Sequence, residues 1–285
     1  MAQSRYENFP VGSLLIPRAL RPDFHAIYAW SRTADDLADE GVSNPGERIE
    51  RLDRLEGDFR RALQGETNLE WPFLPALVET VRRRRIPVDP LFDLLVAFRR
   101  DARGDGFETM EDLLIYCRYS ANPVGRLVLS LFGLLDERRG ELSDRICTGL
   151  QLANFWQDLS VDIPRERVTI PREALRAHGL STARLQSGDV SPKAVESILA
   201  ELVEGARGFF RHGQALIAET PIRRLRWELS AVVAGGLAIL DAVERLGGDI
   251  LHRRPTIGKW SMLKGILRHH PDSPSVRVRP LPDWP

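Results

Sequence analysis

Apolar residues recur with helical spacing along most of this chain, and that periodicity limits the fold more than any other feature. Residues 22–40 carry an apolar stripe, and residues 45–64 carry another, with Pro45 at a position suited to a first helical turn. We find no convincing run of alternating β-branched residues and no internal repeat. The sequence therefore predicts an all-α fold. The expected helices cover residues 22–40, 45–64, 72–85, 89–101, 109–135, 141–162, 171–177, 191–218 and 222–247.

Prolines interrupt this pattern in two places. Residues 163–171, IPRERVTIP, lie between prolines, and a residue before proline disfavours helical geometry, so the preceding helix is expected to end near Asp162. Residues 268–285 are proline-rich and are expected to be extended or mobile. We predict one helical domain over residues 1–267 and a proline-rich tail over residues 268–285.

The charge balance limits the class of partner. Lys plus Arg and Asp plus Glu number 40 each, so the formal net charge is zero. A chain without net charge has no long-range electrostatic field to attract the phosphate backbone of a nucleic acid. We therefore do not expect nucleic acid as a partner. Any bound anion must be held locally, by a metal or by a few arginines.

The cysteines, the longest apolar stretch and the N-terminus favour a reduced, cytoplasmic protein. Cys117 and Cys147 lack metal-ligand spacing and are expected to be buried thiols. The stretch Leu229 to Leu240 has twelve residues, too few for a membrane-spanning helix of about 20, and reads as a core helix. The N-terminus shows no signal peptide.

The first group of polar residues lies in YAWSRTADDLADE. Tyr28, Arg32, Asp35 and Asp39 are spaced +4, +3 and +4, which puts them on one face of a helix. Two carboxylates one turn apart can hold Mg²⁺, which takes one or two carboxylates and fills its other positions with water and phosphate. The alternative is a solvated acidic helix end in which Arg32 pairs with Asp36. Taken alone, this motif leaves both interpretations open.

A second group favours the metal interpretation. In QLANFWQDLSVDIPRER, Gln151, Asn154, Asp158 and Asp162 are spaced +3, +4 and +4 and share one helix face. Their oxygen-bearing side chains suit a metal, its water and a phosphate. We expect the two columns to face each other across a cavity. Two arginines after the second column could close over a diphosphate; they are Arg165 and Arg167.

These two motifs resemble those of the squalene and phytoene synthase family. The resemblance extends over most of residues 6–260 and includes YCRYSANPVG at 116–125 and GGLAILDAVERLGGDILHRRP near the end. It implies an all-α, single-domain isoprenoid-synthase bundle around a central cavity. It also implies coupling of two prenyl diphosphates through a cyclopropyl diphosphate, with Mg²⁺ holding the diphosphates.

The resemblance assigns roles to particular residues. It makes Asp35, Asp39, Asp158 and Asp162 metal ligands. It puts Tyr28 and Arg32 near the diphosphate or the reacting carbons and Tyr116 near the cation and leaving group. It makes Gln151 and Asn154 the polar pair before the second aspartate. It puts an arginine, Arg253 or Arg254, near the diphosphate, and leaves open which.

Three departures from the family pattern bear on the reaction. The usual small apolar segment after Tyr-Cys is here Ser120-Ala121-Asn122-Pro123, the N-terminal segment reads Tyr6-Glu7-Asn8-Phe9-Pro10, and Thr169 replaces a tyrosine. The first two resemble the hydroxysqualene synthase branch of the hopanoid pathway, which ionises presqualene diphosphate and lets water capture the cation. Asn8 and Phe9 are then expected near the substrate, and Asn122 or Glu7 is a candidate to position the water.

The mechanism requires an apolar, aromatic wall around the cation. Candidates for that wall are Phe9, Phe24, Tyr28, Phe155 and Trp156, each of which has plain core packing as its alternative.

Two other functions stay open. One is a head-to-head prenyltransferase that condenses two farnesyl diphosphates to presqualene diphosphate or squalene, or two geranylgeranyl diphosphates to phytoene. The other is a non-enzymatic helical assembly subunit, which the four intact aspartates argue against. Peripheral membrane contact is suggested only by the apolar character of the expected substrate. Functional coupling to other hopanoid-pathway enzymes is suggested only by the resemblance.

Overall fold

The computed structural model describes residues 16–39 and 44–256, and in these ranges every regular element is a helix. The all-α prediction is therefore confirmed. Contacts divide the chain into two compact units, and each is described by itself. Within the described ranges, unit 1 comprises residues 16–39, 44–105 and 118–136, and unit 2 comprises residues 106–117 and 137–256.

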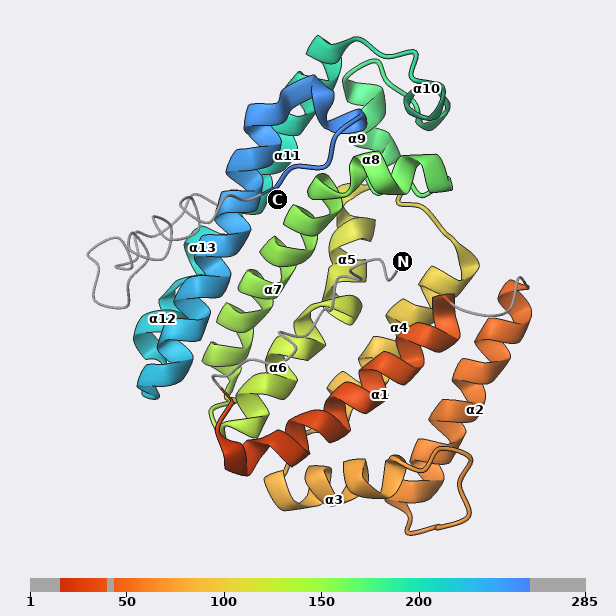
Figure 1. Ribbon diagram of the computed structural model, residues 1–285, viewed down its shortest axis with the longest axis vertical. Helices are drawn as coiled ribbons and strands as arrows, with labels where there is room; N and C mark the ends of the chain where they lie inside the picture. Colours follow the sequence, from red (N-terminus) through yellow and green to blue (C-terminus); the bar gives the residue numbers. More distant parts are fainter. Residues whose placement is uncertain (1–15, 40–43, 257–285) are drawn as a thin grey trace. The chain divides into compact units, whose positions relative to one another are not determined.

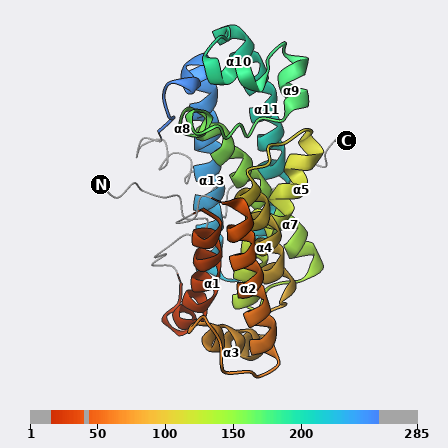
Figure 2. The same ribbon diagram turned by 90° about the vertical axis from the view of Figure 1, so that its right-hand side faces the viewer.

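Unit 1 is built from α1 to α4 and α6. The bounds are α1 Arg21–Asp39, α2 Pro45–Leu63, α3 Leu74–Arg84, α4 Asp89–Arg103 and α6 Asn122–Leu131, with a short 3-10 helix, η1, at Arg18–Leu20. In Figures 1 and 2, α3 runs across one end of α1 and α2. The start of α2 is fixed as predicted: Pro45 opens the helix, and the Asn44 side chain accepts a hydrogen bond of 2.9 Å from the Gly46 N–H.

The core of unit 1 is aromatic and aliphatic. The centre of the Trp30 ring lies 4.7 Å from the centre of the Phe59 ring, and the centres of the Phe59 and Phe92 rings are 5.3 Å apart. The Trp30 indole N–H donates to the Leu91 carbonyl at 3.1 Å, so this buried polar group is satisfied. These contacts connect α1, α2 and α4 and fix the face that α1 turns to the core.

Unit 2 is built around three long helices, α7, α11 and α13, which pack against one another (Figure 1). The bounds are α7 Glu137–Gln157, α8 Leu159–Asp162, α9 Arg172–Ala177, α10 Thr182–Ser187, α11 Pro192–Gly213, α12 Ala215–Glu219 and α13 Arg223–Leu246, with 3-10 helices η2 at Ile163–Arg165 and η3 at Gly247–Leu251. The helix α5, Met110–Ser120, begins in unit 2 and ends in unit 1.

Three of the expected helices differ from the structure. The expected helix 109–135 is interrupted at Ala121 between α5 and α6, because Pro123 has no N–H to continue the helical ladder. The expected helix 141–162 begins earlier, at Glu137, and is interrupted at Asp158. The expected helix 191–218 is divided into α11 and α12.

The helix α10 was not predicted, although the sequence contains residues typical of its start and its end. The Ser181 side chain accepts a hydrogen bond from the Arg184 N–H at the start of α10, and Gly188 ends the helix in the left-handed conformation.

The two cysteines differ in burial. Cys117 is buried as expected, Cys147 is only partly buried, and neither forms a disulfide in the described part of the chain. Burial raises the pKa of the Cys117 thiol far above its usual range. Among the described helices, none is both long and apolar enough to cross a membrane. The predicted tail, 268–285, lies outside the described residues.

Candidate functional site

The first column lies on α1, on the side of the helix that the core leaves partly open. Tyr28, Arg32 and Asp35 are partly exposed and Asp39 is exposed, whereas Ala34 between them is buried. Tyr28 also packs against the core of unit 1. The helix thus presents its aspartates to solvent from a rigid support.

Arg32 is held by its own helix. Its Nη2 atom lies 2.7 Å from Asp36 Oδ1, its Nε atom donates to Asp36 Oδ2 at 3.2 Å, and its Nη1 atom lies 3.5 Å from Asp35 Oδ2. The pair that the acidic-helix alternative predicted is therefore present. The same pair serves the metal interpretation, because a two-point contact fixes the direction of a guanidinium.

The second column lies on α7 and α8. Gln151, Asn154, Asp158 and Asp162 are partly exposed, and the residues between them from Leu152 to Leu159 are buried. The column is therefore the partly exposed side of an otherwise buried helical segment. At its centre the helix is interrupted: the Val161 and Asp162 N–H groups both donate to the Asp158 carbonyl at 2.8 Å.

An arginine far along the chain reaches this column. Arg254 Nε donates to Asp158 Oδ1 at 2.6 Å, whereas the side chain of Arg253 is exposed and has no hydrogen bond or ion pair with a described residue. The segment that carries Arg254 is also anchored through its next residue, Pro255. The side-chain amide of the buried Gln157 donates a hydrogen bond of 2.9 Å to the Pro255 carbonyl. Of the two candidate arginines, the structure brings Arg254 to the aspartates. The sequence analysis did not single out Gln157. Its only signal in the sequence is that it is a polar residue on the otherwise apolar side of the helix.

Burial and charge compete at Asp162. Burial is the largest influence and raises the pKa of this carboxyl above its ordinary value, although Arg167 acts in the opposite direction. Arg165 and Arg167 are exposed, and the Arg167 guanidinium carbon lies 5.8 Å from the centre of the Phe155 ring. Both arginines are accessible to an anion at the end of the column.

Tyr116 belongs to an aromatic cluster in unit 2. Its ring lies 5.3 Å from Phe107 in an edge-on arrangement and 5.8 Å from Phe155, and Phe107 and Phe155 are 6.0 Å apart. Ring faces can stabilise a cation. Of the other wall candidates, Phe24 is buried in the core of unit 1.

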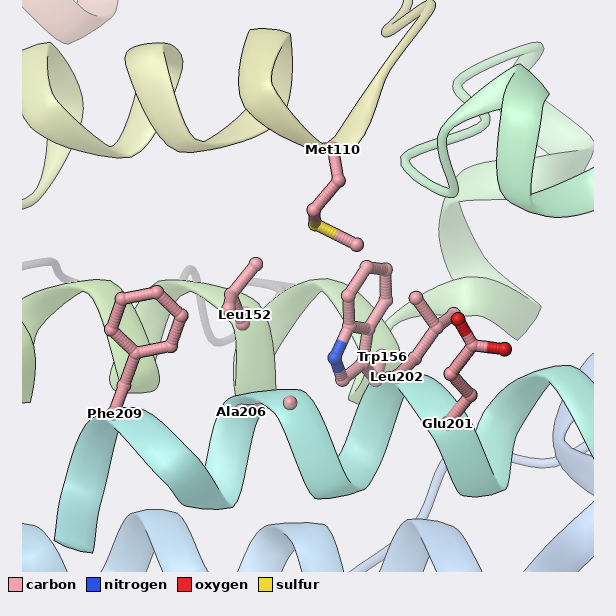
Figure 3. A pocket seen from close by; sticks show the side chains of 8 residues that line it. Met110, Leu152, Trp156, Glu201, Leu202, Ala206 and Phe209 are labelled. Carbon is pink, nitrogen blue, oxygen red and sulfur yellow. The ribbon is translucent and has the colours of Figure 1, made fainter. Parts of the chain in front are cut away.

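Trp156 lies on another side of α7 and lines a small cavity (Figure 3). The cavity has a volume of ≈ 20 Å³, and Figure 3 shows Met110, Leu152 and Phe209 around it. Its lining contains one carboxylate, Glu201, and no basic residue, so it does not suit a diphosphate. We therefore assign Trp156 to the core of unit 2.

Several buried polar atoms have no hydrogen-bond partner among the described residues. They include the hydroxyls of Ser31, Ser120 and Thr169 and the indole nitrogen of Trp156. Ser31 precedes Asp35 by one helical turn, a position that its spacing could have revealed. Asn122 is buried at the start of α6, two residues after Ser120.

The predicted N-terminal contacts, Glu7, Asn8 and Phe9, lie outside the described residues. Asn8 and Phe9 therefore remain predictions.

The aspartate pairs fit a hard divalent cation in their donor chemistry. Each column offers two carboxylates one turn apart, and Mg²⁺ commonly uses only one or two from the protein. In the described part of the chain, no three His, Cys, Asp or Glu side chains converge as a metal site. The pairs thus suit a metal that completes its shell with water and phosphate.

Comparison with known proteins identifies the family. Residues 2–261 match the squalene/phytoene synthase family. A hydroxysqualene synthase from Sinorhizobium fredii is 36% identical over 82% of this chain and 78% of its own length. A phytoene synthase from Thermus thermophilus is 31% identical over 88% of this chain and 84% of its own length.

A solved structure agrees with both. The crystal structure of the squalene synthase HpnC from Alicyclobacillus acidocaldarius superposes with a TM-score of 0.78 at 41% identity, over 86% of this chain and 90% of that one. The fold, the two aspartate columns and the extent of the match lead to one conclusion: this chain belongs to the squalene/phytoene synthase family and is an enzyme of isoprenoid biosynthesis.

Proposed function

We propose that the chain is a hydroxysqualene synthase. It ionises presqualene diphosphate, releases diphosphate and lets water capture the rearranged cation, giving hydroxysqualene on the route to squalene and hopanoids. Two hydroxysqualene synthases, 36% and 35% identical to the chain, support this choice. The polar residues Ser120 and Asn122, which resemble that branch, support it further.

The observation that carries the ionisation step is the second column with its arginine. Asp158 and Asp162 offer carboxylates at a half-buried helix interruption, and Arg254 lies 2.6 Å from Asp158. We propose that Arg254, Arg165 and Arg167 bind the diphosphate, with Gln151 and Asn154 orienting it through their amide groups.

We propose Mg²⁺ as the cofactor, held by Asp35, Asp39, Asp158 and Asp162. When bound, it supplies a Lewis acid that neutralises charge on the leaving diphosphate. Arg32, directed by Asp36, is then a fixed cation for a diphosphate oxygen, and Tyr28 extends the same column with a hydroxyl and an aromatic face.

The carbocation needs a pocket that excludes water and presents electron-rich ring faces. Tyr116, Phe107 and Phe155 form an aromatic cluster with ring separations of 5.3 to 6.0 Å, and we propose that it stabilises the cation after diphosphate leaves. Asn122 is the described residue that we propose to position water. Asn8 and Phe9 are proposed as further substrate contacts.

A head-to-head prenyltransferase remains the second candidate. The phytoene synthase from Thermus thermophilus covers 88% of the chain at 31% identity, so the same family resemblance supports coupling of two prenyl diphosphates. The two candidates differ in substrate: one takes presqualene diphosphate, and the other takes two allylic diphosphates.

A single assay separates them. Purified enzyme is given Mg²⁺ and either presqualene diphosphate or farnesyl diphosphate, without NADPH, and the products are identified by mass spectrometry. We expect hydroxysqualene from presqualene diphosphate, no product from farnesyl diphosphate, and no reaction in EDTA. Presqualene diphosphate accumulating from farnesyl diphosphate would favour the prenyltransferase, and geranylgeranyl diphosphate tests phytoene formation in parallel.

The surroundings of the reaction follow from its chemistry. The substrate and product are long apolar chains, so we propose a cytoplasmic enzyme with peripheral membrane contact. Hydroxysqualene carries a hydroxyl that squalene lacks, so we propose functional coupling to a reductive enzyme of the hopanoid pathway. Co-sedimentation with phospholipid vesicles tests the membrane contact.

A further inference from the structure

The hydroxyl of Ser120, like that of Ser31 in α1, lacks the hydrogen bond that several other buried hydroxyls make within the described residues. Ser130 donates to the Arg126 carbonyl at 2.8 Å, Ser230 donates to Arg226 at 2.8 Å, and Thr220 donates to Leu216 at 2.7 Å. Each uses the carbonyl four residues earlier, the usual way to satisfy a hydroxyl within a helix. Ser120 is only 9% exposed, yet its hydroxyl has no partner among the described residues.

A buried hydroxyl without a hydrogen bond costs free energy, and alanine or valine would avoid that cost. A buried polar group of this kind is usually paired with a small partner such as a water molecule or an ion when the protein itself offers none.

The surroundings of Ser120 favour a neutral occupant. It lies at the interruption between α5 and α6, where Ala121, the N-cap of α6, provides no side-chain cap. Asn122 follows at the first position of α6 and is also 9% exposed, and an asparagine amide carries two donor hydrogens and an acceptor oxygen. A hydroxyl and an amide two residues apart give two polar partners, which is the minimum for a buried water.

The position in the helix connects this group to the reaction. Ser120 comes four residues after Tyr116 in α5, so the two residues share one helix face. Tyr116 belongs to the aromatic cluster, with Phe107 and Phe155, that is proposed above to stabilise the cation. A water held one turn away would therefore be on the side of α5 where the cation forms.

We propose that Ser120 and Asn122 bind the water molecule that captures the carbocation. This inference rests on the proposed function. The carbon–oxygen bond to diphosphate breaks first, and the oxygen of the held water then forms a bond to the cationic carbon. The water loses one proton, for which the released diphosphate is the available base, and no oxidant or reductant takes part.

The test measures how the cation is partitioned among products. Presqualene diphosphate and Mg²⁺ are given to the wild type, Ser120→Ala, Ser120→Thr and the matched control Ser130→Ala, and both diphosphate release and product identity are followed. We expect Ser120→Ala to lower the ratio of hydroxysqualene to alkenes formed by proton loss about tenfold, with diphosphate release within about twofold of wild type. Ser120→Thr keeps the hydroxyl and is expected to restore most of the ratio. Ser130→Ala, which removes a satisfied hydroxyl from the same unit, is expected to leave it unchanged.

An unchanged ratio in Ser120→Ala, or the same drop in Ser130→Ala, overturns the inference while the proposed function stands. Absence of hydroxysqualene from the wild type overturns both. A crystal structure provides a readout that does not depend on turnover. We expect an ordered water within hydrogen-bonding distance of Ser120 Oγ in the wild type and none at that place in Ser120→Ala. A well-ordered wild-type crystal without a water at Ser120 Oγ overturns the proposal.

Discussion

The two aspartate columns present similar side chains on differently built supports. The first lies on an uninterrupted helix, α1, and its arginine, Arg32, comes from the same helix one turn away. The second lies across a helix interruption at Asp158, and its arginine, Arg254, comes from 96 residues later in the chain. The first column is thus a product of local sequence, and the second depends on tertiary structure.

This difference has an energetic meaning. Contacts between neighbouring turns of one helix are individually weak, and they form as soon as the helix does. The ion pair between Asp158 and Arg254 is as partly buried as the pair in the first column, but it also depends on the buried Gln157 contact that holds the segment carrying Arg254. The second column should therefore be the more sensitive to replacement of its supports.

The largest effect is expected from the column carboxylates themselves. Asp158→Asn should lower kcat/KM by about 10³-fold or more, because it removes both a metal ligand and the partner of Arg254. Asp35→Asn should have an effect of similar order if the two columns share the metal. Steady-state kinetics measure both, with the exposed Asp189→Asn as a control that stays near wild type. An Asp158→Asn enzyme with more than a tenth of wild-type activity would contradict the metal assignment.

The next effect separates the two adjacent arginines. Arg254→Ala should lower kcat/KM about 100-fold, because the arginine that contacts Asp158 is lost, while Arg253→Ala should change it less than about twofold. Arg254→Lys should fall between them, since lysine keeps the charge and loses the planar geometry. Equal losses in Arg253→Ala and Arg254→Ala would mean that the observed contact does not decide which residue acts.

A smaller effect is expected where the first column is supported. Asp36→Asn removes the charged partner that directs Arg32 and should lower kcat/KM by about three- to tenfold, far less than Asp35→Asn. The same kinetic assay, repeated at several Mg²⁺ concentrations, measures it. Should Asp36→Asn prove as damaging as Asp35→Asn, with a raised requirement for Mg²⁺, Asp36 would be a metal ligand and not only a support.

The smallest effect on activity should come from the base of α1. Asp23 is 1% exposed and accepts hydrogen bonds from Arg83, from Arg84 at 2.7 Å and from Thr80 at 3.2 Å, which ties α1 to α3. Asp23→Asn should reduce the free energy of unfolding by about 2 kcal/mol and change kcat little, as urea denaturation and kinetics at the same temperature would show. Loss of activity without loss of stability would contradict a purely structural role.

That contribution should depend on pH in a defined direction. Burial alone would raise the pKa of Asp23, but the hydrogen bonds from Arg83 and Arg84 outweigh it and leave the pKa below its ordinary value. The stabilisation is therefore fully present above the ordinary carboxyl range near about pH 4 and is lost as the pH falls through the lowered pKa. The difference in urea midpoint between wild type and Asp23→Asn should accordingly shrink in acid.

Local patterns in the sequence predicted the parts of the structure that depend on local physics. The stripe from Phe24 to Ala38 and the spacing of Asp35 and Asp39 follow from helical periodicity, and α1 has both. The proline at 123 and the Ser181 and Gly188 caps were equally local signals, and the interruption at Ala121 and the helix α10 could have been read from them.

The contacts that complete the second column could not be predicted in this way. Arg253 and Arg254 are adjacent in an irregular segment after η3, where no periodicity indicates which side chain turns to Asp158. The choice depends on the hydrogen bond between Gln157 and Pro255, a contact over 98 positions that no local pattern encodes. The unsatisfied hydroxyl of Ser120 likewise became visible only once burial and partners were known.

The long separation between Asp158 and Arg254 also has a consequence for the order in which the protein is made. Translation delivers the residues of both columns first, and Arg254 emerges only 96 residues after its partner Asp158. A nascent chain therefore carries its aspartates long before it has the arginine that pairs with Asp158. Chains that terminate before the segment that follows α13 are expected to keep the preceding helices and to lack the completed anion site.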